Sequence, residues 1–311
     1  MLRDAHGLAV AGEGQAGAGK QSSERFRSAD FRAADRLAVA MTLVAAVCQM
    51  RSTADGAGNL RQAEELVRAA AARGATFVAT PENTNYLGPH SEKVRLAETL
   101  DGPVCRLFSS LARELSLHLL LGSFNEKSSV KGLCSNTSVL FGPDGVRLAV
   151  YRKMHLFDVD VPDGVSFRES ATVAPGAELV VAATSFGALG LSICYDLRFG
   201  ELYRALVARG ATVLTIPSAF TATTGKAHWE ILVRARAIES QAFVVAPGQH
   251  GEHGDSGLRE SHGHSLIVDP WGRILAEAAD GVGFALAELD LAEVARVRAA
   301  IPIAAHRRLP G

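Results

Sequence analysis

The chain has 311 residues, of which 48% are hydrophobic and 21% are charged, and its formal net charge is −1. This is the composition of a globular protein with enough apolar material for a large core, in one large domain or two smaller ones. The near-zero charge gives no electrostatic reason to bind nucleic acid or an anionic membrane, and no apolar run is long enough for a transmembrane helix.

The first forty residues are rich in Gly, Ala and Ser and carry scattered charges of both signs. They lack the apolar stretch of a secretory signal, and their acidic residues argue against an organelle transit peptide. We therefore predict a disordered extension over residues 1–40 and a folded domain over residues 41–311.

A glycine-rich stretch within the extension resembles a phosphate-binding loop. Gly12–Gly17 matches G-x-G-x-x-G, and Gly14–Lys20 matches G-x-x-x-x-G-K. A functional loop follows a strand and places Ser or Thr after the lysine to bind magnesium, whereas Gln21 follows Lys20 here. We interpret the stretch as a flexible tail, and ATP binding stays only as an alternative that deletion of residues 1–40 tests.

The four cysteines are sparse, irregularly spaced and form no C-x-x-C motif: Cys48, Cys105, Cys134 and Cys194. In a chain of this length the pattern predicts reduced thiols and a cytoplasmic location.

Three chemically reactive side chains come at the ends of apolar runs. Glu82 ends the run 75–82, Lys153 ends the run 146–153, and Cys194 ends the run 189–194. The runs predict buried strands, and an amphipathic helix is expected from Tyr195 onward. Because burying separate charges is costly, we expect the three side chains to share one site.

These three groups are sufficient for amide hydrolysis. A carboxylate accepts the thiol proton, the thiolate attacks the carbonyl carbon, and the ammonium stabilises the resulting oxyanion. We further expect the start of a helix after Cys194 to favour its thiolate and to direct backbone N–H groups at the substrate. The alternatives are a buried structural thiol and a surface ion pair.

Two segments of the chain recur in the same order. Residues 72–81 are echoed by residues 208–217 at an offset of 136, and residues 138–149 by residues 265–276 at an offset of 127. The first segment predicts a glycine-capped helix end leading into a strand, and the second predicts a hairpin. Helical periodicity marks residues 59–68 in one half and 229–240 in the other.

Each half thus predicts a sheet covered by helices on one side. Burying the two bare sheet faces against each other gives an α/β four-layer αββα sandwich with two internally similar halves. Glu82 lies one residue past the repeated strand of the first half, and its counterpart in the second half is Ser218. We expect the site where strand ends of both halves converge.

From about residue 42 to the C-terminus the chain resembles the nitrilase, or carbon–nitrogen hydrolase, superfamily, and specifically its Nit subfamily. The matching motifs, in order, are 81–83 (PEN), 151–158 (YRKMHLFD), 167–170 (FRES), 193–199 (ICYDLRF), 217–220 (PSAF), 228–239 (HWEILVRARAIE) and 263–272 (GHSLIVDPWG). The resemblance implies the same four-layer sandwich.

The resemblance also implies roles for individual residues. Cys194 would be the nucleophile, Glu82 the general base, Lys153 the cation at the oxyanion, and the backbone N–H of Tyr195 a second oxyanion donor. Glu169 matches a further carboxylate of the family's pocket that positions water or the amide nitrogen; the alternative is a solvated loop residue.

The function expected from this resemblance is hydrolysis of the terminal amide of a small carboxylic acid through a thioester on Cys194, with release of ammonia. The motifs 228–239 and 263–272 look most like the deaminated-glutathione amidases, with ω-amidases acting on 2-oxoglutaramate-type substrates as the close alternative. A nitrilase, an N-carbamoyl amidohydrolase and a non-catalytic scaffold are further alternatives. The family usually has Tyr where this chain has His262, which leaves the substrate preference open.

We expect no cofactor and no metal. Asp158, Asp160 and Glu169 only loosely match a calcium loop, because Pro162 occupies a ligand position. Four histidines, His250, His253, His262 and His264, have no tetrahedral zinc spacing, and we interpret their segment as a mobile loop at the pocket mouth. The expected partners are a small-molecule amide substrate and copies of this chain in a homodimer or larger homo-oligomer, with no nucleic acid and no membrane.

Overall fold

The computed structural model describes residues 42–160, 166–256 and 260–308. The extension over 1–40 and its glycine-rich stretch lie outside the described residues. Within the described part of the chain, no helix is long and apolar enough to cross a membrane.

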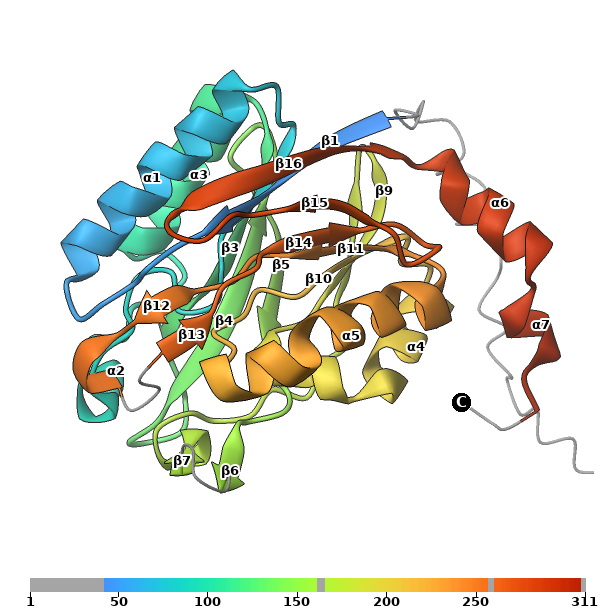
Figure 1. Cartoon of the computed structure of the whole chain (residues 1–311). Helices are drawn as coiled ribbons and strands as arrows, with labels where there is room; N and C mark the ends of the chain where they lie inside the picture. Colours follow the sequence, from blue (N-terminus) through green and yellow to red (C-terminus); the bar gives the residue numbers. More distant parts are fainter. Residues whose placement is uncertain (1–41, 161–165, 257–259, 309–311) are drawn as a thin grey trace, which may run out of the picture. The chain divides into compact units, whose positions relative to one another are not determined.

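Two six-stranded sheets form the centre of the fold (Figure 1). The first has the order β16-β1-β2-β3-β4-β5, with strands Gly283–Asp290, Thr42–Gln49, Phe77–Ala79, His118–Lys127, Cys134–Phe141 and Arg147–Arg152. The second has the order β8-β9-β10-β11-β14-β15, with strands Val181–Thr184, Gly187–Leu191, Val213–Thr215, Phe243–Ala246, Leu266–Val268 and Ile274–Glu277.

The two sheets have the same topology. Strands β1, β2 and β3 are parallel, as are β9, β10 and β11, and each trio has an antiparallel strand on one side and an antiparallel hairpin on the other. The glycine-capped turns that precede β2 and β10 contain Gly74 (φ +91°) and Gly210 (φ +97°), a left-handed conformation that glycine adopts without a Cβ clash. The predicted duplication is confirmed.

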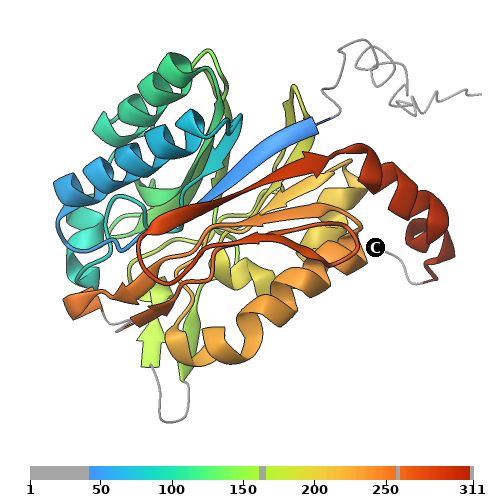
Figure 2. The same ribbon diagram turned by 45° about the horizontal axis from the view of Figure 1, so that its top comes forward.

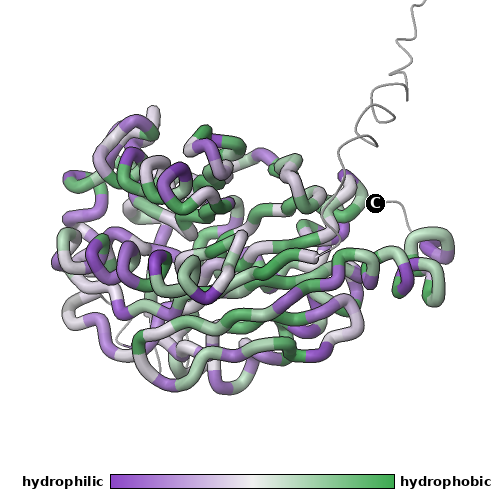
Figure 3. The backbone as a smooth tube through the Cα atoms, turned by 90° about the horizontal axis from the view of Figure 1, so that it is seen from above, coloured by the Kyte–Doolittle hydropathy of each residue, from purple (hydrophilic) through white to green (hydrophobic). Residues whose placement is uncertain are grey.

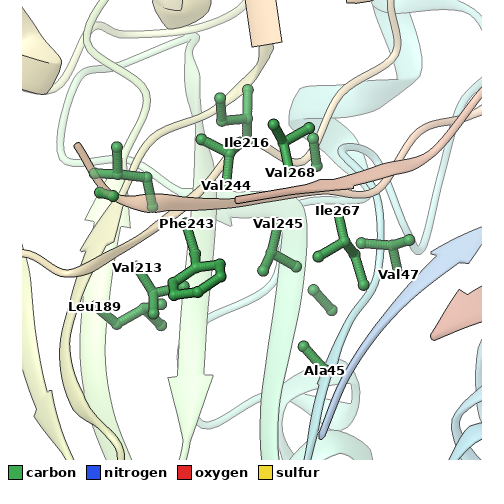
Figure 4. Close-up of a cluster of buried hydrophobic side chains, with 14 of the residues drawn as sticks. Ala45, Val47, Leu189, Val213, Ile216, Phe243, Val244, Val245, Ile267 and Val268 are labelled. Carbon is green, nitrogen blue, oxygen red and sulfur yellow. The ribbon is translucent and has the colours of Figure 1, made fainter. Parts of the chain in front are cut away.

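The inner sheet faces pack against each other because side chains alternate along each strand. In β1, Ala45 and Val47 belong to the core shared with the second sheet, whereas Ala46 and Cys48 pack under the helices of the first half. Figure 4 shows Val245 directed toward these inner residues of β1.

The outer faces carry the helices (Figure 2). The first sheet is covered by α1 (Gly56–Ala72) and α3 (Pro103–Leu115), and the second by α4 (Gly200–Ala208) and α5 (Ala222–Ser240). The tube in Figure 3 is mainly hydrophobic along the central strands and alternates along the helices, as expected when each helix buries one face. The result is the expected four-layer αββα sandwich.

Shorter elements complete the chain. They are α2 (His90–Arg95), the ribbon β6–β7 (Asp158–Asp160, Ser166–Arg168), the ribbon β12–β13 (His250–Glu252, Glu260–His262), and α6 (Ala292–Ala300) with α7 (Ile303–His306). One-turn 3₁₀ helices occupy Glu169–Ala171 (η2), Cys194–Arg198 (η3) and Gly254–Ser256 (η4).

Candidate active site

Lys153, Glu82 and Glu169 meet in one buried cluster. Lys153 directly follows β5, Glu82 lies three residues beyond β2, and Glu169 begins η2. The Lys153 Nζ donates hydrogen bonds of 2.8 Å to Glu82 Oε1 and 2.8 Å to Glu169 Oε2, and the three side chains are only 2–4% exposed. Glu169 is therefore a buried member of the cluster and not a solvated loop residue.

Lys153 and Glu169 keep each other ionised. Burial by itself lowers the pKa of Lys153, but the charges of Glu169 and Glu82 outweigh burial and hold that pKa well above its usual value. Burial likewise raises the pKa of Glu169, yet Lys153 and Lys93 outweigh it, and the pKa of this carboxyl lies below its usual value. At neutral pH, Lys153 and Glu169 are both charged.

Both halves of the fold orient the Glu82 carboxylate. Asn136 in β4 donates from Nδ2 to Glu82 Oε1 at 2.8 Å and to Glu169 Oε1 at 3.1 Å. The backbone N–H of Ala219 donates to Glu82 Oε2 at 2.9 Å. Ala219 lies in the segment after β10, so the segments that follow β2 and β10 in the two halves meet at this carboxylate.

Sequence reasoning overlooked Asn136. Its only signal is a run of four polar residues, 135–138, in a strand that is buried throughout. Such a run resembles an exposed edge unless the neighbouring strands are known.

Cys194 lies beside this cluster in a strained turn. Strand β9 ends at Leu191, three residues earlier than predicted, and Cys194 starts the one-turn helix η3 in place of a long amphipathic helix. The first long helix, α4, begins only at Gly200. Cys194 has φ +48°, a left-handed conformation that is costly for a residue with a Cβ, and its N–H donates to Pro217 O at 2.9 Å.

The thiol of Cys194 is neutral in this environment. Burial raises its pKa well above the usual value, and the nearby Glu82 carboxylate, with which it shares a hydrogen bond, raises it further; Lys153 opposes both only in part. The expectation that a helix start favours the thiolate is wrong, because the helix has a single turn and burial beside a carboxylate outweighs it.

Asp196 fixes the turn that carries Cys194. Its carboxylate is fully buried and accepts hydrogen bonds from Ile193 N (2.9 Å), Tyr151 Oη (2.7 Å) and His155 N (3.0 Å). It also lies 2.7 Å from His155 Nδ1. Asp196 thereby ties the nucleophile turn to the segment that contains Lys153.

A cleft opens above these groups. It encloses about 410 Å³ open to solvent and has Lys153, Glu82, Glu169 and Cys194 on its wall. The remaining lining residues are Asn83, Lys93, Phe157, Phe167, Tyr195, Ala219, Phe220, Thr221 and Thr224. Its aromatic walls and the few polar groups among them suit a small organic substrate.

The backbone N–H of Tyr195 lies in the first turn of η3, where such groups have no partner within the helix. The arrangement thus brings together a proton acceptor, a nucleophile and cationic or N–H donors at the wall of one cleft.

The histidine-rich segment lies elsewhere. His250 and His262 pair across the ribbon β12–β13, and His253 in the connection between its strands is buried against Ser52 O, so the described part of this segment contains a paired β-ribbon and not a loop alone. None of the four histidines is among the described residues that line the cleft. Within the described ranges, no group of three or more His, Cys, Asp or Glu side chains could hold a metal ion.

The loosely calcium-like residues also have other contacts. Asp158 and Asp160 lie in β6, paired with β7, and Glu169 bonds to Lys153.

Residues 44–299 match the family model described as carbon-nitrogen hydrolase. The chain belongs to the carbon-nitrogen hydrolase family. It is 45% identical over 267 residues to the deaminated glutathione amidase of a Synechocystis strain, covering 85% of this chain and 97% of that protein. It is 43% identical over 270 residues to the deaminated glutathione amidase of Bos taurus, covering 85% and 82%.

Among solved structures, the crystal structure of the Caenorhabditis elegans NitFhit protein superposes with a TM-score of 0.80 at 40% identity. The match covers 86% of this chain and 65% of that one. The nitrilase-like fold and the resemblance to the Nit subfamily are confirmed.

We expect Asp196→Asn to weaken both the fold and the nucleophile turn. An amide nitrogen cannot accept a hydrogen bond, so at least one buried donor loses its partner, at a cost of about 1–3 kcal/mol in the free energy of unfolding. Urea denaturation would measure this loss, and steady-state kinetics should show a lower kcat with a smaller change in KM. Asp280→Asn, whose side chain is 89% exposed, is the matched control. Wild-type stability and kcat in Asp196→Asn would show that the turn is held by other contacts.

Glu169 should contribute to the acid sensitivity of the fold. Its pKa is depressed in the folded protein, so its ionisation contributes stability that is present above the ordinary value of 4.5 and is lost as the pH falls from there toward the folded pKa. In Glu169→Gln, which cannot titrate, the free energy of unfolding should fall less steeply below pH 4.5 than in wild type. Urea denaturation across this range would measure it, with the exposed Glu230→Gln as control. Identical slopes in Glu169→Gln and wild type would contradict the depressed pKa.

Proposed function

We propose that the chain hydrolyses the amide bond of a small carboxylic acid, with Cys194 as nucleophile, Glu82 as general base and Lys153 as oxyanion cation. The observation that carries the proposal is the contact of a neutral Cys194 thiol with a Glu82 carboxylate that is itself bonded to Lys153. Membership of the carbon-nitrogen hydrolase family makes the protein a hydrolase of carbon–nitrogen amide bonds.

In the first half-reaction, the Cys194 thiol gives its proton to Glu82 as the sulfur attacks the amide carbonyl carbon. A thiol with a raised pKa needs this transfer, because little thiolate exists beforehand. Lys153 has three N–H donors and uses two on the carboxylates, which leaves one for the oxyanion beside the backbone N–H of Tyr195. The leaving amine takes the proton from Glu82 as the carbon–nitrogen bond breaks, and a thioester remains.

In the second half-reaction, Glu82 accepts a proton from water while the water oxygen attacks the thioester carbonyl. The carbon–sulfur bond breaks, the acid is released, and the proton returns to sulfur. We assign Glu169 to positioning: it fixes Lys153 and is itself held by the backbone N–H of Phe157 at 2.7 Å.

We propose deaminated glutathione as the substrate, with 2-oxoglutaramate as the close alternative. The relatives at 45% and 43% identity are named deaminated glutathione amidases, which supports deaminated glutathione as the substrate. Both compounds are amides of the same 2-oxoglutaryl group, so one acyl pocket would serve them. The leaving amine differs: deaminated glutathione releases the dipeptide cysteinylglycine, whereas 2-oxoglutaramate releases ammonia, so ammonia release is expected only of primary amides.

A substrate panel tests this proposal. Wild type should turn over deaminated glutathione, followed by free-amine detection of cysteinylglycine, with a higher kcat/KM than 2-oxoglutaramate, an N-carbamoyl amino acid or a simple nitrile, each followed by ammonia. Better turnover of the nitrile or the N-carbamoyl compound would overturn the amidase assignment. Turnover of none of them, together with slow labelling of Cys194 by an electrophile, would indicate a binding scaffold.

Glu82→Gln should lose most turnover while the protein stays folded. General acid–base groups contribute about 10²- to 10⁴-fold, and here one carboxylate serves both half-reactions. The same variant should slow alkylation of Cys194, because the proton acceptor of the thiol is gone. Cys194→Ala defines the background rate, and Glu252→Gln, an exposed glutamate in the ribbon β12–β13, is the surface control. Wild-type turnover in a folded Glu82→Gln would move the base to Glu169.

We also propose a homo-oligomer in a reducing, cytoplasm-like compartment. Ile231 and Ile238, two turns apart on α5, are 69% and 48% exposed, and Trp271 in the adjoining turn is 54% exposed. An apolar patch of this kind is typical of a protein–protein interface and supports the oligomer. The reducing compartment is supported by a separate observation, since all four cysteines are free thiols. Light scattering should give at least a dimer mass, and Ile231→Glu should shift it toward the monomer; a monomeric wild type would contradict the proposal.

A further inference from the structure

A second lysine reaches the catalytic cleft, and the mechanism above does not use it. Lys93 belongs to the short helix α2, where it follows Glu92 and precedes the exposed Arg95 in sequence. Its sequence neighbours suggest a surface residue, yet its side chain is only 3% exposed and lines the same cleft as Cys194 and Lys153.

The ammonium of Lys93 lacks a close partner in the part of the chain that the structure describes. The neighbouring carboxylates, Glu82 and Glu169, both form their ion pairs with Lys153, whose ammonium contacts one oxygen of each at 2.8 Å. Lys93 acts on them only at longer range, through its charge.

A lone buried ammonium is unfavourable, because desolvation penalises its charge and no hydrogen-bonded anion compensates. Burial accordingly lowers the pKa of Lys93, and the more distant Glu169 and Glu82 offset this effect only in part. The cleft thus contains one cation that is already paired, Lys153, and a second, Lys93, that is positioned to pair with an anionic group of a molecule that enters the cleft.

We propose that Lys93 determines substrate specificity by binding the carboxylate at the end of the acyl group remote from the scissile amide. The proposal rests on the function proposed above, whose substrates are amides of a short dicarboxylic acid, and adds the residue that recognises their ionised end, with the amide end at Cys194 and the carboxylate at Lys93. Phe157 and Phe167, which also line the cleft, suit the intervening methylene groups. Neutral amides of the same length lack the group that would pair with Lys93.

The experiment compares two substrates that differ in this charge and by one methyl group, glutaramate and its methyl ester, both followed by ammonia release. Wild type should prefer glutaramate. In Lys93→Met, which keeps the length of the side chain and removes its charge, the ratio of the two kcat/KM values should fall about 10- to 100-fold, as expected for a lost charged hydrogen bond. The change should lie mainly in KM for glutaramate.

Two further variants serve as controls, and thermal unfolding shows whether each variant is folded. Lys226→Met removes an exposed lysine of α5 outside the cleft and should leave the ratio at its wild-type value. Lys93→Arg keeps the cation and should retain most of the preference. An unchanged ratio in a folded Lys93→Met overturns the proposal, and so do equal losses on both substrates, which would mean that Lys93 acts through Glu169.

A structure of the wild-type protein with bound glutarate tests the proposal without any variant. One carboxylate should lie at Cys194 and the other within about 3 Å of Lys93 Nζ, and a carboxylate bound elsewhere overturns the inference. Failure of the proposed function has a separate signature, because wild type would then turn over neither substrate, whereas turnover of both without a preference for glutaramate overturns only the inference about Lys93.

Discussion

A lysine buried between two carboxylates holds this site together. Lys153 bonds to Glu82 and Glu169 at 2.8 Å each, and these two carboxylates compensate the cost of burying its ammonium. Each comes from a different segment: the end of β2, the end of β5 and the helix η2. The ion cluster therefore makes the position of each segment depend on the other two, and it defines where Cys194 must lie to react.

The second half of the fold supplies Cys194 and part of the support for Glu82. Cys194 comes from the segment after β9, and the N–H of Ala219 from the segment after β10. Asn83 and Cys194 both have left-handed backbones, with φ of +58° and +48°. Such strain persists only where surrounding contacts over-determine the conformation, and here the fully bonded Asp196 and the ion cluster provide those contacts.

The electrostatics of the cleft favour a reaction in which proton transfer and attack are coupled. A buried thiol beside a carboxylate stays neutral, which protects it from unselective chemistry until a carbonyl carbon is placed against the sulfur. Lys153 forms ion pairs with two carboxylates in the resting protein, whereas Lys93 has no close partner among the described residues. On this difference we base the proposed roles of the two cations, with Lys153 assigned to the chemistry and Lys93 to recognition of the substrate.

Much of this protein follows from local sequence. The apolar runs predicted the strands and, at their ends, the catalytic candidates Glu82, Lys153 and Cys194. The ordered repeats, with glycine-capped turns at Gly74 and Gly210, predicted the two halves. Local sequence suffices for these features because strand periodicity and turn conformation depend on a few adjacent residues. The ordered motifs were also sufficient to recognise the carbon–nitrogen hydrolase family.

Only the tertiary structure decided the rest. Asn136 resembles an exposed strand residue and Lys93 a surface charge until distant segments bury them. The helix start after Cys194 likewise predicted a thiolate, whereas burial and the nearby Glu82 carboxylate raise the pKa of Cys194 and keep the thiol neutral. Burial and pKa are sums over neighbours far apart in the chain, and no local window contains those sums.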